Sequence, residues 1–136
     1  MLMAQQKLFP EVANIISVIE SGARQDIVIL IIPSHDKHKK ALNNQDVWAG
    51  EAMELFKDLY RGATGFKTFA GIYLTDEGET LHDIPILIES YVSRESLVDK
   101  SRLNELVRFM KRMGRETKQF AVAVVINDVF HEIKEF

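Results

Sequence analysis

The predicted fold is organised around the stretch Gly65–Val92, which reads GFKTFAGIYLTDEGETLHDIPILIESYV. Its first part, Phe66–Leu74, is rich in aromatic and β-branched residues, and its last part, Ile84–Val92, is almost continuously apolar. Between them lies an acidic turn around Gly78, and glycine can adopt the positive φ that a hairpin loop needs. The stretch therefore predicts an antiparallel hairpin that turns at Gly78.

The segments on either side of this hairpin predict two further strands and two helices. Asp26–Pro33 and Phe120–Ile126 are nearly all aliphatic, which is typical of strands covered on both faces. A polar loop, Ser34–Asn44, follows the first of them. Apolar residues at helical spacing then form two stripes. The stripes are Trp48, Ala52, Leu55, Phe56 and Leu59 in the first helix, and Leu103, Leu106, Val107 and Met110 in the second helix, Leu97–Met113.

The resulting order is βαββαβ, preceded by a helix at Phe9–Ser21 whose apolar face carries Val12, Ile15, Ile16 and Ile19. This order predicts an α+β fold of the ferredoxin-like type, a two-layer sandwich with an antiparallel sheet ordered 4-1-3-2 and an extra N-terminal helix. The length of 136 residues favours one domain. We divide it into an N-terminal helical addition (1–24), a core (25–127) and a tail (128–136).

Composition excludes several classes of protein. The chain has no cysteine, which rules out disulfides, thiolate zinc sites and cysteine nucleophiles. A net charge of −3 disfavours binding to nucleic acid or to a membrane surface. No apolar run approaches the ~20 residues that span a bilayer, and the N-terminus lacks the pattern of a signal peptide. We therefore expect a cytoplasmic protein.

The two apolar strands also predict self-association. A two-layer sandwich leaves one face of the sheet open, and strands that face water on one side should alternate apolar with polar residues. Ile27–Ile32 and Phe120–Ile126 do not alternate. The N-terminal helix is too small to cover the whole second face, so we expect a homodimer formed through the sheet.

The predicted topology gathers basic residues at one edge of the sheet. The candidates for binding an anion there are His35, Lys37, His38, Lys40, His82, Arg115 and Lys118. His35 and His38, with His82 or Asp83, are also the residue types that bind a metal, but ligands in a lysine-rich loop are poorly fixed, and we assign no metal site. The simplest interpretation is a solvated polar loop beside a basic helix end.

Glu89 is the second candidate, because it interrupts the apolar strand ILIESYV. Period-two alternation places Glu89 on one face with Leu87 and Tyr91, where a carboxylate needs a cation or a hydroxyl as partner. Such a residue can bind a donor group of a ligand, with Tyr73, Tyr91 or Trp48 as pocket walls. A structural ion pair at the rim of the sheet is the alternative that we favour.

Several short pieces between Ile31 and Val92 resemble a set of short bacterial proteins of unknown function. The pieces are Pro33-Ser34, Trp48, Gly62-Ala63-Thr64, Gly71-Ile72-Tyr73 and Glu89. The resemblance implies a small α+β domain of the accessory-gene type, and it implies no activity.

No motif assembles a reaction centre, so we identify no catalytic residue and no cofactor. We therefore favour a non-enzymatic binding or accessory domain that acts as a homodimer. One alternative is an enzyme or small-molecule-binding protein with a pocket centred on Glu89. Another alternative is anion or nucleic-acid binding through the basic edge, residues 35–40 and 111–118.

Overall fold

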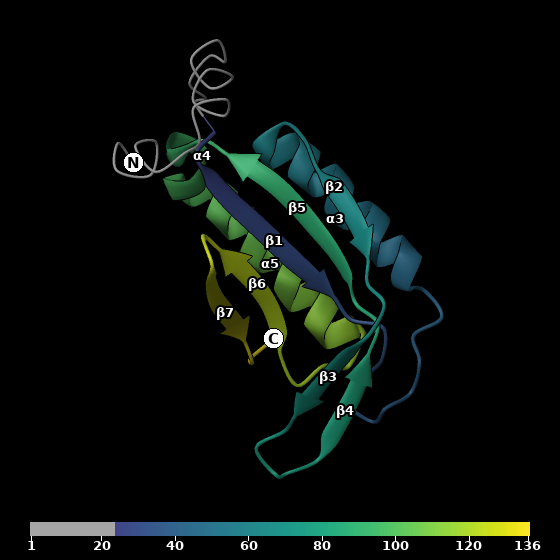
Figure 1. Ribbon diagram of the computed structural model, residues 1–136. Helices are drawn as coiled ribbons and strands as arrows, with labels where there is room; N and C mark the ends of the chain where they lie inside the picture. The colour runs from purple at the N-terminus through teal and green to yellow at the C-terminus, as the bar shows by residue number, and fades with distance from the viewer. Residues whose placement is uncertain (1–23) are drawn as a thin grey trace, which may run out of the picture.

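The computed structural model describes residues 24–136, so the predicted helix Phe9–Ser21 lies outside the described part (Figure 1). Along this part of the chain, one strand and one helix are followed by four strands, two helices and two final strands. In order they are β1 (Asp26–Ile32), α3 (Gln45–Tyr60), β2 (Thr64–Lys67), β3 (Gly71–Leu74), β4 (Thr80–Asp83), β5 (Ile86–Val92), α4 (Arg94–Val98), α5 (Lys100–Glu116), β6 (Val122–Ile126) and β7 (Val129–Ile133).

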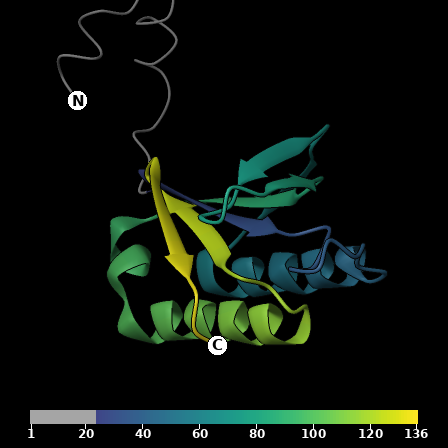
Figure 2. The ribbon, with the colours of Figure 1, turned by 90° about the horizontal axis from the view of Figure 1, so that it is seen from below.

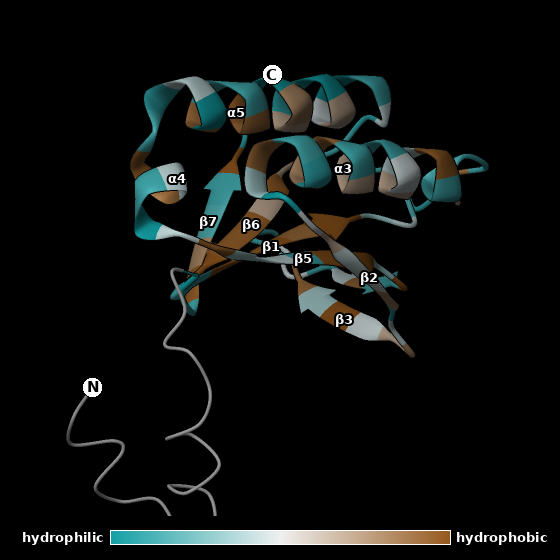
Figure 3. Cartoon of the chain, turned by 90° about the horizontal axis from the view of Figure 1, so that it is seen from above, coloured by the Kyte–Doolittle hydropathy of each residue, from teal (hydrophilic) through white to brown (hydrophobic). Residues whose placement is uncertain are grey.

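Five strands form an antiparallel sheet in the order β2-β5-β1-β6-β7, and β3 and β4 form a separate two-stranded sheet. The helices cover one face of the larger sheet, as Figures 2 and 3 show. The expected class, an α+β domain with an antiparallel sheet and helices, is confirmed. In the register of the sheet, Ile29 on β1 lies opposite Glu89 on β5 and Val125 on β6.

The core lies between the sheet and the helices. Every second residue of β1 and β5 is buried on the helix side, in the pattern expected of strands with one covered face. Both expected helical stripes contribute to the core, but Val107 is 37% exposed and the stripe of α5 runs instead through Phe109 and Met113. The stripe of α5 is therefore shifted from the prediction at this one position.

The predicted hairpin is wrong in its extent. Only β2, not the whole of Phe66–Leu74, pairs with β5. Thr68 closes this pairing, because its N–H and its hydroxyl both donate to the carbonyl of Pro85, at 3.3 and 2.8 Å. Pro85 has no N–H with which to continue a ladder. The chain then makes the separate β3–β4 hairpin, which projects from the end of the sheet in Figure 1.

The turn of that hairpin lies where the sequence predicts it. Gly78 has a φ of 82°, the left-handed conformation that glycine adopts without a steric cost. The N–H of Gly78 donates to the carbonyl of Thr75 at 2.9 Å, which closes the turn.

The second predicted helix is two helices, α4 and α5. Asp99 separates them, and its carboxylate accepts a hydrogen bond at 3.0 Å from the backbone N–H of Arg102 in the first turn of α5. The backbone of Asp99 has the extended conformation of an N-cap residue, with φ −68° and ψ 119°, so α4 ends before it.

The predicted tail is in large part a strand. Asn127 and Asp128 both have positive φ, 50° and 67°, and they turn the chain back so that β7 pairs with β6. The folded domain therefore extends beyond residue 127. Among the described helices, none is long and apolar enough to cross a membrane.

Candidate functional site

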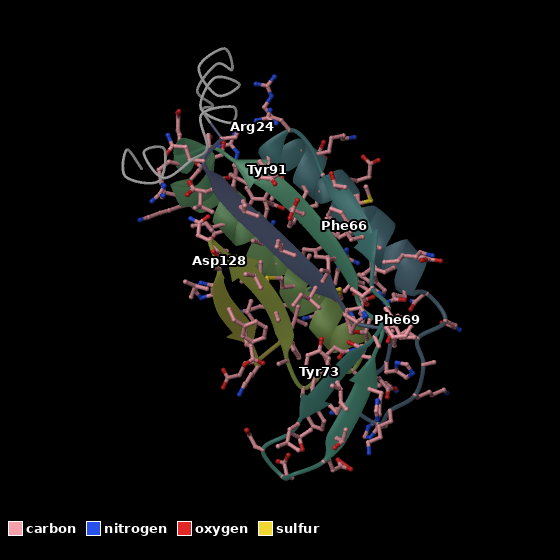
Figure 4. All side chains as sticks on the ribbon, in the orientation of Figure 1. Arg24, Phe66, Phe69, Tyr73, Tyr91 and Asp128 are labelled. Atoms are coloured by element: carbon pink, nitrogen blue, oxygen red, sulfur yellow. The ribbon has the colours of Figure 1, made fainter. Side chains whose placement is uncertain are left out.

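A cleft of about 540 Å³ lies between the β3–β4 hairpin, the loop after β1 and the β6–β7 edge of the sheet. Three aromatic side chains line it, Tyr73, Phe120 and Phe130, and each is about half exposed. Figure 4 shows Tyr73 on the hairpin, at the end of the molecule away from Arg24. The other lining residues are mostly polar or charged: His35, Asp36, Lys37, Lys39, Thr75, Asp76, Glu77, His82, Asp83, Gln119, Glu132 and Lys134, with Leu74, Leu81 and Ala121.

His35 and Asp83, which line this cleft, form a hydrogen-bonded group with the buried Ser34. Oδ1 of Asp83 accepts hydrogen bonds from the backbone N–H of Ser34 at 2.8 Å and from that of Ile84 at 3.0 Å. The hydroxyl of Ser34 also contacts this oxygen, and it lies 2.7 Å from Nδ1 of His35. These bonds join the end of β1 to the end of β4, so they fix the base of the hairpin against the large sheet.

Further bonds hold the loop after β1 in place. The amide of Gln119 donates to the carbonyl of His35 at 2.9 Å, and the N–H of Lys37 donates to the carbonyl of Lys118 at 2.9 Å. Lys39 forms an ion pair with Glu79 on the hairpin, with a distance of 3.2 Å between Nζ and Oε1. The loop after β1 is thus bonded on one side to the segment before β6 and on the other side to the β3–β4 hairpin.

Two ionisable groups of this region have shifted pKa values. The backbone N–H groups of Lys40 and His38 donate to Asp36 and lower the pKa of its carboxyl group, with the bond from Lys40 the larger cause. Burial raises the pKa of the Tyr73 phenol, and the nearby Asp83 adds to the effect. Asp36 is therefore an anion at neutral pH, and Tyr73 keeps its O–H as a donor.

The structure brings some of the predicted basic edge to this cleft. His35, Lys37 and His82 line it, whereas Lys40 and Lys118 line a neighbouring hollow of about 330 Å³. His38 and Arg115 line neither of these two. The basic side chains also alternate with acidic ones, so the edge is mixed in charge. Within residues 24–136 no three histidine, aspartate or glutamate side chains are grouped to hold a metal ion.

The residues proposed around Glu89 are not brought together. Glu89 and Tyr91 lie on the open face of the sheet, the side away from the helices. Figure 4 shows this face toward the viewer, with Tyr91 and Phe66 labelled. Trp48 is buried on the other side of the sheet, edge-on to Phe109 at 5.8 Å between ring centroids. Tyr73 lines the cleft instead. A single pocket walled by these four residues is therefore absent from this part of the chain.

Sequence reasoning missed the contribution of the C-terminal residues to the cleft. Phe130, Glu132 and Lys134 line it because β7 returns along the edge of the sheet. The dipeptide Asn127-Asp128, directly after the apolar run of β6, was the available signal, since these residue types tolerate the positive φ of a tight hairpin turn.

No protein-family model matches the sequence, and the search of curated proteins found no match. The solved structures that share the fold include two of a phage enzyme. A phage SAM lyase in complex with S-methyl-5'-thioadenosine has a TM-score of 0.60 and 15% sequence identity, over 86% of this chain and 95% of that chain. A phage SAM lyase in the apo state has a TM-score of 0.59 and 16% identity over the same shares.

These comparisons correct the functional preference reached from sequence. We expected a non-enzymatic accessory domain because no catalytic motif could be identified. The two structures named above are of an enzyme, a phage SAM lyase, and this finding contradicts that expectation. At 15–16% identity the likeness itself establishes the shared fold.

Proposed function

We propose that this chain is an enzyme that binds S-adenosylmethionine, or a closely similar sulfonium nucleoside, and cleaves it to release S-methyl-5'-thioadenosine. The observation that carries the proposal is the fold match, which extends over 95% of the phage SAM lyase chain. The match also supports a ferredoxin-like core, as does the run β6-β1-β5-β2 within the sheet. The hairpin β3–β4 and the strand β7 would be additions to that core.

The cleft suits a ligand of this kind. Its volume of about 540 Å³ lies in the range of small-molecule sites. Aromatic rings such as Tyr73 and Phe120 can stack on a nucleobase and can also attract a cation to their faces. The carboxylates of Asp83 and Glu132 favour the positive charge of a sulfonium and of an ammonium group.

The reaction makes modest demands on the protein. Release of the thioether breaks the bond between the sulfonium sulfur and the γ-carbon of the amino acid, and the bonding electron pair goes to sulfur. The pair that replaces it at carbon comes either from the substrate's own carboxylate, which closes a lactone, or from a C–H bond on the neighbouring carbon, whose proton then passes to a base such as the carboxylate of Glu132 in the cleft. Because the leaving group is neutral, the protein has mainly to hold one reactive conformation and to exclude water.

Incubation of the purified protein with S-adenosylmethionine tests the proposal. Chromatography with mass detection should find S-methyl-5'-thioadenosine, together with either a lactone or an unsaturated amino acid, and the second product identifies the source of the electron pair. Tyr73→Ala and Phe120→Ala should each lower the rate at least tenfold. Val98→Ala, at an exposed apolar residue of α4 outside the cleft, is the matched control.

Two results would contradict the proposed function. One is a wild-type protein that neither releases the thioether nor binds it by calorimetry. The other is a release rate that falls equally in the cleft variants and in Val98→Ala, because that pattern points to lost folding rather than to a site.

We also propose that the chain forms a homodimer through the open face of the sheet. Ile27, Ile29 and Ile31 on β1 lie on that face between Tyr91 and Leu87 of β5 on one side and β6 on the other. Large apolar side chains on a sheet face favour contact with a second apolar surface, and the same face on another copy supplies one.

A further inference from the structure

The hydrogen bonds among Ser34, His35 and Asp83 determine which nitrogen of the His35 ring carries the proton. We infer that His35 is held with its proton on Nδ1, so that Nε2 presents a lone pair to the cleft and accepts a hydrogen bond from a donor of the ligand. The identity of that ligand as a nucleoside rests on the proposed function, whereas the position of the proton on the ring rests on the structure alone.

The first step is the direction of the bond between Ser34 and Asp83. Their oxygens Oγ and Oδ1 are in hydrogen-bond contact. An ionised carboxylate carries only lone pairs, and a serine hydroxyl has one proton. Two oxygens that approach this closely without a proton between them repel each other, so the hydroxyl of Ser34 donates to Asp83.

The second step is the count of bonds that remain for Ser34. After its proton is used, Oγ can only accept, and it has two lone pairs. The N–H of Ile84 takes one of them, at 2.8 Å, and shares its proton with Oδ1 of Asp83 at 3.0 Å. Nδ1 of His35 lies 2.7 Å from the same oxygen, so it must supply the proton of that contact. Nδ1 is therefore protonated.

The third step is the other ring nitrogen. A neutral imidazole with its proton on Nδ1 has an unprotonated Nε2, which is an acceptor. The side chain of His35 is 33% exposed, and the residue lines the cleft. Nδ1 is turned toward Ser34, and the hydrogen bonds found among residues 24–136 leave Nε2 unused. The cleft thus contains an oriented, uncharged acceptor beside the ammonium groups and carboxylates that also line it.

The ligand class follows from this chemistry. A nitrogen lone pair selects an O–H or N–H donor, and a nucleoside has ribose hydroxyls and, in adenosine, an exocyclic amino group. Ser34 and Asp83 are positioning residues in this scheme, because they act on the ligand only through the orientation and the tautomer of His35.

Nitrogen-15 NMR of the histidine rings in the free protein tests the tautomer without any ligand. At pH 8 we expect His35 to have its proton on Nδ1. His38, exposed in the same loop, serves as the internal reference for a histidine in solvent. In Ser34→Ala the preference of His35 should disappear. A proton on Nε2 of His35 in the wild type, or on both nitrogens, would overturn the inference.

Two substitutions at His35 test the role of Nε2. In His35→Asn the amide can still donate to Ser34 from near the place of Nδ1, but nothing replaces Nε2. In His35→Gln the amide oxygen can reach near the place of Nε2. By calorimetry with S-methyl-5'-thioadenosine we expect binding at least tenfold weaker in the Asn variant, a smaller loss in the Gln variant, and no change in the control His38→Asn.

The two experiments separate this inference from the proposed function. Unchanged binding in His35→Asn, with a wild-type protein that binds, overturns the role of Nε2. A wild-type protein that does not bind S-methyl-5'-thioadenosine overturns the proposed function and the ligand assignment together, and the NMR measurement then decides the tautomer separately.

Discussion

At the scale of single residues, the buried hydroxyl of Tyr60 lowers the stability of the fold. Its ring is buried and packs edge-on against Phe56, with 5.2 Å between centroids, and burial raises the pKa of its phenol. Its hydroxyl has no hydrogen-bond partner among the described residues. A buried hydroxyl without a partner costs about 1–3 kcal/mol.

Tyr60→Phe keeps the ring and removes that hydroxyl, so we expect the free energy of unfolding to rise by about 1 kcal/mol. Urea denaturation measures the change. Tyr91→Phe, at an exposed ring of the open face, is the control and should leave stability unchanged. A loss of stability in Tyr60→Phe would show instead that the hydroxyl makes a favourable bond in solution.

The hydrogen bonds of Asp26 should make the stability of the fold depend on pH. It is 1% exposed, and its carboxylate accepts a hydrogen bond from Asn127 at 2.8 Å and two from Arg94 at 2.9 and 2.7 Å. The bond from Asn127, and then those from Arg94, hold the pKa of Asp26 below its ordinary value. A lowered pKa in the folded state means that the unfolded chain binds the proton more readily.

The ionised carboxylate of Asp26 therefore contributes fully to the free energy of unfolding above about pH 3.9, the pKa of an aspartate in the unfolded chain. This contribution is lost as the pH falls through the lower pKa of the folded state. Unfolding in urea, compared at pH 7 and at pH 3, should show a loss in the wild type that is smaller in Asp26→Asn, because the amide does not titrate. An identical loss in both proteins would mean that other groups cause it.

Residues of the candidate site could be predicted only in part. His35, Lys37 and His82 were expected at one edge, because that edge follows from the order of strands. The link between Ser34 and Asp83 was not expected, since 49 positions separate them and they follow or end strands of two different sheets, β1 and β4, which only the folded structure brings together. No local spacing encodes such a contact.

At the scale of elements, the turn between β6 and β7 offers a direct test. Asp128 has a φ of 67°, and a non-glycine residue in the left-handed region carries a steric cost. Asp128→Gly should raise the free energy of unfolding by up to about 1 kcal/mol, and Asp128→Val should lower it by about 1–2 kcal/mol. Thermal unfolding of the two variants checks this. If both variants unfold at the same temperature as the wild type, the backbone of Asp128 is not strained in this turn.

The same elements show why sequence predicts strands better than their partners. The buried strands β1, β5 and β6 were found from their continuous apolar runs. The hairpin was misjudged, because the aromatic character of Phe66–Leu74 hides a break at Phe69-Ala70, after which the chain leaves the large sheet. The strand β7 was missed, because its residues are largely exposed and lack a periodic apolar pattern.

At the scale of the whole molecule, the area of the open face of the sheet sets how stable the proposed homodimer would be. Five strands spaced by ~4.8 Å, with an average length of about 19 Å, make a face of roughly 450 Å². Two such faces in contact bury roughly 900 Å², close to the lower limit of about 1,000 Å² for a specific interface. A dimer formed in this way should therefore be weak, and its population should depend on protein concentration.

Sedimentation equilibrium at micromolar concentrations should accordingly show a mixture that moves from monomer to dimer as concentration rises. Ile29→Lys places a charge at the centre of the face, next to Val125, and should shift the mixture to monomer. Glu89→Leu removes a charge that loses its water when the interface forms, so this variant should shift the mixture toward dimer. Val47→Lys, at an exposed residue of α3 on the helix side, should leave it unchanged. A monomer at every concentration, or equal masses for the wild type and Ile29→Lys, would show that the open face does not join two copies.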